Sequence, residues 1–157
     1  MPSRLRPSRI LQLACAAALL TATPAAADAP TGHADLAVTV VGPAPVQDGG
    51  STTAYAVVTN TGTAATAVPV TLYVHLPPGV VGTGTSSKAA CSTLPHGHTV
   101  QCVIPPGLAP TAIVTAAVRI SVASGMGPET LAGDAEAELP DDPTPQNNAT
   151  TFAITVL

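Results

Sequence analysis

Apolar and polar residues alternate one by one through most of this chain. From Val68 to Leu76 every second residue is apolar, and the residues between them are Pro69, Thr71, Tyr73 and His75. Successive side chains on a β-strand point to opposite faces, so each such segment buries one face and exposes the other. The same spacing recurs at residues 36–40, 100–104, 114–122, 131–139 and 152–156. The pattern predicts a chain built from short strands.

Turn-forming residues separate these segments. Gly, Pro, Asp and Asn cluster at residues 42–43, 48–50, 60–62, 77–79, 105–107 and 141–148. Residues 51–60 are apolar on both faces, which is typical of a central strand. Seven or eight strands without an amphipathic helix predict an all-β fold, a single antiparallel β-sandwich. We expect a core of Val, Leu, Ile and Ala, with Tyr55 and Phe152 as its aromatic members.

The first 27 residues have the composition of a secretory signal peptide. Arg4, Arg6 and Arg9 precede an apolar stretch at 10–20, and a run of small residues ends at Ala27, where we expect cleavage. The apolar stretch is shorter than the about 20 residues that span a membrane. Cys15 leaves a lipoprotein signal as an alternative. Residues 28–34 are expected to form a flexible leader and residues 35–157 the β-sandwich module.

Removal of the signal peptide leaves a strongly acidic chain. All 157 residues together have a net charge of −4. Residues 28–157 keep the nine acidic residues but only Lys88 and Arg119 as basic ones, which gives −7. Such a charge disfavours nucleic acids and anionic membranes as partners. The two cysteines of this part, Cys91 and Cys102, are expected to form a disulfide, because exported proteins are oxidised.

Five short motifs follow one another in the module. They are ADLAV at 34–38, TNTG at 59–62, LPPGV at 76–80, Cys91 with VQC at 100–102, and PQNN at 145–148. In this order they resemble the bacterial surface-protein module known as domain of unknown function eleven and, more loosely, the cell-adhesion-related domain found in bacteria. The resemblance covers residues 34–157. It implies an immunoglobulin-like sandwich, secretion and a structural or adhesive role, and it supplies no catalytic residues.

Such modules usually recur in tandem within wall-anchored proteins. This chain has a single copy and ends at Leu157 without a sorting motif or a hydrophobic tail. The resemblance to such modules therefore does not extend to a covalent anchor at the cell wall.

Two groups of residues have side chains that can bind metal ions. His96 and His98 could bind copper, nickel or zinc if His33 or His75 supplied a third ligand, and the alternative is a polar hairpin loop. Carboxylates and amides at 134–148 (Asp134, Glu136, Glu138, Asp141, Asp142, Asn147 and Asn148) could bind calcium. We favour a solvated acidic face, with Asn147 and Asn148 bonding their own turn. We assign no metal and no cofactor.

The sequence has no arrangement that favours catalysis. It lacks a G-x-S-x-G motif, and a disulfide would leave no free thiol in the module, so we do not expect an enzyme. Tyr73 is the aromatic residue expected on an outer face, beside His75. One aromatic platform is thin support for sugar binding.

The function that we expect is that of a secreted, non-enzymatic surface, adhesion or structural interaction module. Its partner would be a cell-surface or extracellular protein, and strand addition at a sheet edge is one possible mode of contact. One alternative is a small diffusible binder, an inhibitor or carrier of an apolar ligand, which would use Pro/Gly-rich loops at 77–87 and 104–111. A metal binder that uses His96 and His98 is the other.

Overall fold

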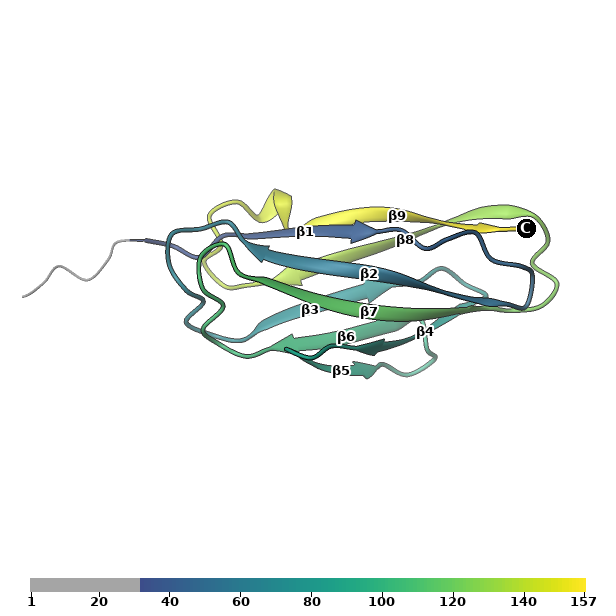
Figure 1. Cartoon of the computed structure of the whole chain (residues 1–157), viewed down its shortest axis with the longest axis horizontal. Helices are drawn as coiled ribbons and strands as arrows, with labels where there is room; N and C mark the ends of the chain where they lie inside the picture. Colours follow the sequence, from purple (N-terminus) through teal and green to yellow (C-terminus); the bar gives the residue numbers. More distant parts are fainter. Residues whose placement is uncertain (1–31) are drawn as a thin grey trace, which may run out of the picture.

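The computed structural model describes residues 32–157, which form nine β-strands and one short 3₁₀ helix (Figure 1). The strands are β1 (Leu36–Val41), β2 (Ser51–Asn60), β3 (Val70–His75), β4 (Val80–Thr85), β5 (Ala90–Thr93), β6 (Thr99–Ile104), β7 (Ile113–Val122), β8 (Glu129–Glu138) and β9 (Ala149–Val156), and the helix is η1 (Pro145–Asn147). Within this range no helix is long and apolar enough to cross a membrane. The predicted signal peptide and its cleavage site at Ala27 lie outside the described residues.

The strands form two antiparallel sheets. One has the order β1-β2-β7-β4 and the other β5-β6-β3-β8-β9. Taken as strands A, B, E and D, the first sheet matches one sheet of an immunoglobulin constant domain, and β3, β8 and β9 match strands C, F and G of the other. The β5–β6 hairpin is an addition at the edge of β3. The predicted immunoglobulin-like sandwich is therefore confirmed, with nine strands where we expected seven or eight.

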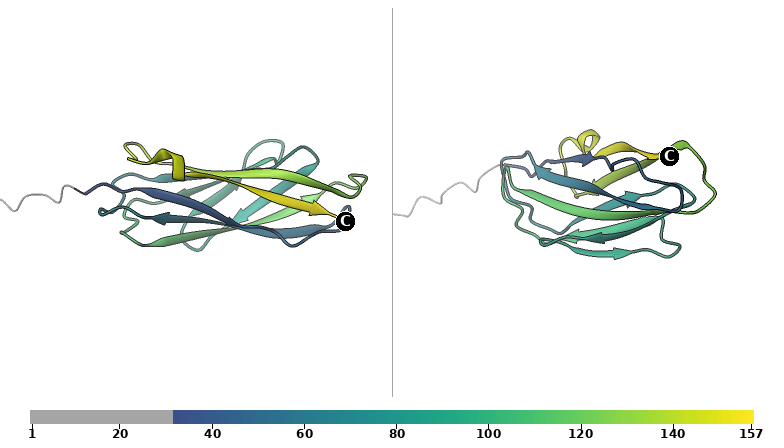
Figure 2. Two further views of the ribbon diagram at one scale, coloured as in Figure 1. Left: turned by 90° about the horizontal axis from the view of Figure 1, so that it is seen from above. Right: turned by 45° about the vertical axis from the view of Figure 1, so that its right-hand side comes forward.

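The two sheets approach one another along both sides of the sandwich. On one side β1 lies beside β8 and β9 (Figures 1 and 2). Val46 closes this side through a parallel bridge, in which its N–H donates to the Thr155 carbonyl at 2.9 Å and its carbonyl accepts from the Leu157 N–H at 2.8 Å. On the other side β4 lies beside β5 and β6.

The core between the sheets is aliphatic, as the composition predicts. Phe152 is the one aromatic residue that the structure buries among residues 32–157. Tyr55 is the correction, because it is 45% exposed on the outer face of the four-stranded sheet. Residues 51–60 are apolar on both faces, so the sequence alone did not show which face of β2 is buried.

The strand β4 lies within the segment 77–87 that we expected to be a loop. Its inward positions are Val80, Gly82 and Gly84, so apolar side chains do not alternate along it. A Cβ on Gly82 would lie 2.6 Å from Leu76 Cδ1, and a Cβ on Gly84 would collide with Val100. The glycines are thus required by the close approach of β4 to β6, and they hide the strand from a search for alternation.

A single buried asparagine organises the end of the sandwich where β2 ends. Asn60 is fully buried. Its Oδ1 accepts from the N–H groups of Asp35 (3.2 Å) and Gly62 (3.0 Å), and its Nδ2 donates to the carbonyls of Ala64 and Leu108, both at 2.8 Å. All four hydrogen-bonding positions of the amide are therefore used. This network explains why the TNTG motif places an asparagine at the end of this strand.

Candidate functional site

The outer face of the four-stranded sheet carries exposed hydrophobic side chains. Odd-numbered residues of β1, β2, β4 and β7 point outward, and even-numbered residues point into the core. Four of the seven large hydrophobic residues that are exposed in the described part of the chain lie on this face: Val41 (62%), Tyr55 (45%), Val81 (45%) and Ile113 (49%). We call the outward residues of these four strands the Tyr55 face. Figure 1 shows β2 and β7 in the front layer, with β3 and β8 fainter behind them.

The strand register places Tyr55 in the middle of this face. It pairs with Val41 of β1 on one side and with Ala117 of β7 on the other, and Ala117 pairs in turn with Thr85 of β4. The next row holds Val57, opposite Thr39 and Thr115. Directly opposed side chains on one face of a sheet touch, so these residues form a continuous surface.

The Tyr55 face contains one charged residue. Arg119 is the only Lys, Arg, Asp or Glu in β1, β2, β4 and β7, and its Nη2 donates to Ser51 Oγ at 3.2 Å. The remaining outward residues are aliphatic side chains, threonines and serines. Val41, Tyr55 and Ala117 adjoin one another in one row, with Val57 in the next. An apolar cluster among polar neighbours is characteristic of sites where other molecules bind.

The outer face of the five-stranded sheet has the opposite character. Asp134, Glu136 and Glu138 are all exposed there, as the alternation predicts. The rings of Tyr73 and His75 stack beside them, with centroids 5.9 Å apart. The acidic residues continue along this one strand, while both cations of the module lie elsewhere.

Tyr73 and His75 are held by neighbours on the adjacent strands. Gln101 Nε2 donates to the Tyr73 hydroxyl at 3.2 Å. His75 places Nδ1 3.1 Å from Thr99 Oγ1 and Nε2 3.4 Å from Glu136 Oε1. These contacts use the polar atoms of both rings within the sheet surface.

The acidic segment at 134–142 does not converge on one point. Asp142 turns toward β1, where its carboxylate accepts from the N–H groups of Leu36 (2.8 Å) and Thr144 (2.9 Å). Within residues 32–157, no three His, Cys, Asp or Glu side chains are grouped so that they could hold a metal ion. Strand β8 and the loop after it therefore keep apart carboxylates that are close together in the sequence.

Our prediction for the Asn147 side chain is wrong. Its Nδ2 donates to Asp35 Oδ1 at 3.1 Å, across to the residue before β1, instead of bonding its own turn. The turn is closed by backbone, since the N–H groups of Asn147 and Asn148 donate to the carbonyls of Thr144 (3.1 Å) and Pro145 (3.3 Å). The Asn147 side chain is consequently free to reach β1.

His96 and His98 lie in the turn of the β5–β6 hairpin, and His98 caps the edge of β4 together with Gly97. His98 Nδ1 lies 2.7 Å from the Val80 carbonyl, and the Gly97 carbonyl accepts from the Gly82 N–H at 2.9 Å. Thr93 Oγ1 donates to the Gly82 carbonyl at 3.0 Å. Backbone groups on a free strand edge would otherwise invite another strand to pair. His98 therefore has a structural role that the sequence did not reveal.

The disulfide between Cys91 and Cys102 is present, as the sequence predicts. It joins directly opposed residues of β5 and β6. It therefore cross-links the two strands of the added hairpin and does not link the two sheets.

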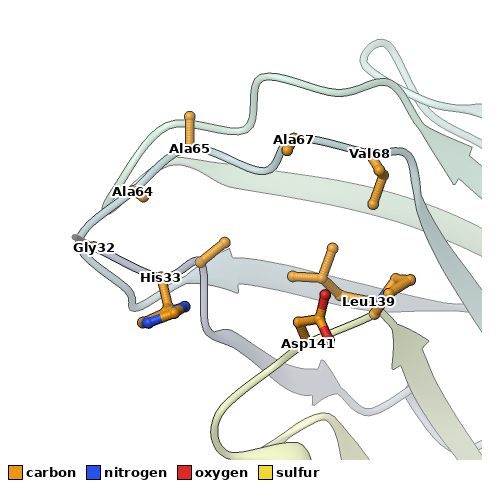
Figure 3. A pocket seen from close by; sticks show the side chains of 10 residues that line it. Gly32, His33, Ala64, Ala65, Ala67, Val68, Leu139 and Asp141 are labelled. Carbon is orange, nitrogen blue, oxygen red and sulfur yellow. The ribbon is translucent and has the colours of Figure 1, made fainter. Parts of the chain in front are cut away.

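Three surface cavities lie near the ends of strands. One of about 230 Å³ lies between the loop bearing Ala64 and Val68 and the segment bearing Leu139 and Asp141 (Figure 3). Two others, of about 400 and 700 Å³, adjoin one another where Lys88 meets Pro105 and Pro106. Mainly apolar side chains line all three.

Comparison with known proteins identifies the fold and goes no further. No protein-family model and no curated protein matches this chain. AvmM, which catalyses macrocyclization in alchivemycin A biosynthesis, is similar with a TM-score of 0.51 and 16% identity over 78% of this chain and 88% of that one.

Two further solved structures are similar to a comparable degree. A CARDB domain from Pyrococcus furiosus, in complex with di-metal ions, has a TM-score of 0.51 and 16% identity over 79% of this chain and 89% of that one. A non-cellulosomal cohesin from Archaeoglobus fulgidus has a TM-score of 0.50 and 11% identity over 78% and 91%. An enzyme, a metal-bound domain and a cohesin share this architecture, so fold alone does not select a function. The comparisons therefore support the fold alone: the chain is an immunoglobulin-like β-sandwich, an architecture that the CARDB domain also has.

Proposed function

We propose that residues 35–157 are an exported, non-enzymatic interaction module that binds its partner through the Tyr55 face. The observation that carries this proposal is the concentration of exposed hydrophobic residues on that one face. Leaving a Tyr, an Ile and two Val side chains in water costs free energy, and contact with a partner recovers it. The mainly aliphatic and hydroxyl-bearing character of the face suits a protein partner.

Two features support export: the composition of residues 1–27 and the disulfide. The basic, apolar and small-residue segments at 1–27 favour a signal peptide cleaved after Ala27. A disulfide persists outside the reducing cytosol, which fits secretion to the medium or the cell surface. We also infer membership of domain of unknown function eleven, because Asn60 and Gly62 of the TNTG motif have defined structural tasks here. A Cβ on Gly62 would collide with the His33 carbonyl.

A diffusible carrier of an apolar ligand is less well supported. The buried side chains of both sheets fill the space between them, and the cavities beside Lys88 lie at the surface. The segment 77–87, which we expected to offer a binding loop, is partly the strand β4. The packed core and the surface cavities therefore support an interaction module better than a ligand carrier.

Fractionation of the producing culture tests the proposal. We expect the wild-type protein to be retained on cells and released by salt or mild detergent, and Tyr55→Lys to move at least half of it into the medium. Tyr73→Lys is the matched control, since it makes the same exchange on the central strand of the other sheet. Equal retention of both variants would contradict the role of the Tyr55 face, and free release of the wild type would favour the diffusible binder.

A further inference from the structure

We infer that the partner of the Tyr55 face is a second copy of this chain, packed against the first through the same sheet. This inference rests on the proposed function of that face and names its occupant. Three features of the described residues support it: the extent of the face, the placement of charge and the distribution of apolar and polar side chains.

The face is large enough for a weak dimer. Its four strands have 6, 10, 10 and 6 residues, and at about 3.3 Å per residue and about 4.8 Å between strands they make a surface of about 500 Å². The pair would bury about 1,000 Å², which is the size of weak or transient interfaces. Sheets commonly pack face to face in this manner, about 10 Å apart.

The distribution of charge permits two acidic molecules to meet at this face. The module has eight carboxylates, from Asp35 to Asp142, against Lys88 and Arg119. None of the eight lies in β1, β2, β4 or β7, and three lie on the outer face of the opposite sheet. In a face-to-face dimer the three carboxylates of β8 point away from the interface, so they do not oppose the contact.

The side chains of the face suit a self-complementary contact. Tyr55, Val57 and Ala117 form an apolar centre, while Thr53, Arg119 and Thr83 form a more polar row beside it. An apolar centre within a polar border is the usual anatomy of an interface, and a central tyrosine often supplies much of its affinity. A two-fold axis near Tyr55 would place each copy's apolar centre on the other.

Analytical ultracentrifugation of the protein purified from the producing culture tests the inference. We expect a concentration-dependent dimer, a rise of at least tenfold in Kd for Tyr55→Lys, and no change for Tyr73→Lys. Far-ultraviolet circular dichroism and a thermal melt check that each variant is folded. If Tyr55→Lys does not fold, Val57→Lys on the same face takes its place.

A monomer at all concentrations would overturn the inference, and so would a dimer that Tyr55→Lys leaves intact. These outcomes are separable from those of the fractionation experiment. A monomeric wild type whose retention on cells still depends on Tyr55 would mean that the face binds a different protein, so the proposed function stands and the inference falls. A dimer that depends on Tyr55 without any effect on retention supports the inference and contradicts the proposed role of the face in retention.

Discussion

At the scale of single residues, the molecule depends on a few polar groups in an otherwise aliphatic interior. Asn60 joins the segment before β1, the loop after β2 and the loop before β7 through one amide. Thr66 adds to the same end of the sandwich, since its hydroxyl accepts from the N–H groups of Gly107 (3.2 Å) and Leu108 (3.0 Å). A buried polar network stabilises a fold only while every member has its partner.

We expect Asn60→Ala to lower the free energy of unfolding by about 2–4 kcal/mol, because it leaves buried N–H and carbonyl groups without partners. Urea denaturation followed by circular dichroism measures this. Asn147→Ala serves as the comparison, since that half-buried side chain makes one hydrogen bond, to Asp35, and its loss should cost about 1 kcal/mol. Equal losses for the two variants would show that the Asn60 network does not stabilise this end of the fold.

At the scale of strands and turns, the β5–β6 hairpin distinguishes this sandwich from a seven-stranded one. The hairpin extends the five-stranded sheet at β3, and its turn caps the edge of β4 through His98, Gly97 and Thr93. Strand addition at the capped part of β4 would have to displace these contacts. This is one reason why we place the partner on a sheet face and not at this edge.

The disulfide should matter mainly to the hairpin. In the chain-entropy model, a bridge over a loop of this length contributes about 3 kcal/mol. We expect Cys91→Ala with Cys102→Ala to lower the free energy of unfolding by about 2–3 kcal/mol. We also expect hydrogen exchange to accelerate first in β5 and β6. Acceleration spread evenly over both sheets would argue against a local role.

The close packing of β4 gives a second prediction for the elements. Gly84→Ala adds a Cβ that collides with Val100 and should cost about 1–3 kcal/mol. Gly42→Ala, where the structure has no atom within 4 Å of the added Cβ, should change stability by less than about 0.5 kcal/mol. Thermal unfolding of the two variants compares them. A Gly84→Ala protein as stable as Gly42→Ala would mean that β4 can move away from β6.

The same elements show how far the sequence could predict the fold. Alternation identified β1, β3, β6, β7, β8 and β9, because each has side chains of contrasting polarity on its two faces. It missed β4, whose inward positions include two glycines, and β5, which has no buried residue. It also assigned Tyr55 to the core, because both faces of β2 are apolar. The Tyr55 face was not predictable, since it arises from the register of four strands that are distant in sequence.

At the scale of the whole molecule, the two outer faces differ in character. One carries aliphatic and hydroxyl side chains, Tyr55 and a single arginine, and the other carries a row of carboxylates. Such asymmetry orients the molecule toward a partner and keeps its other side in water.

Export provides a prediction for the whole chain. We expect the protein recovered outside the cell to begin at Asp28, because the small residues before it form the cleavage site. Intact-mass measurement of the extracellular protein, before and after reduction, gives both the start of the chain and the state of Cys91 and Cys102. A mass that includes residues 1–27 would contradict cleavage at Ala27. A lipid adduct at Cys15 would favour the lipoprotein alternative.

The direction of the first and last strands has a mechanical consequence. The described chain enters the sandwich at one end of its long axis and leaves it at Leu157 at the other (Figure 1). A pull on these two points would slide β1 along β2 and β9 along β8, loading the hydrogen bonds of each ladder together and not one after another. Single-molecule stretching should therefore find abrupt rupture at high force. This geometry should make the sandwich resist a pull applied between these two points.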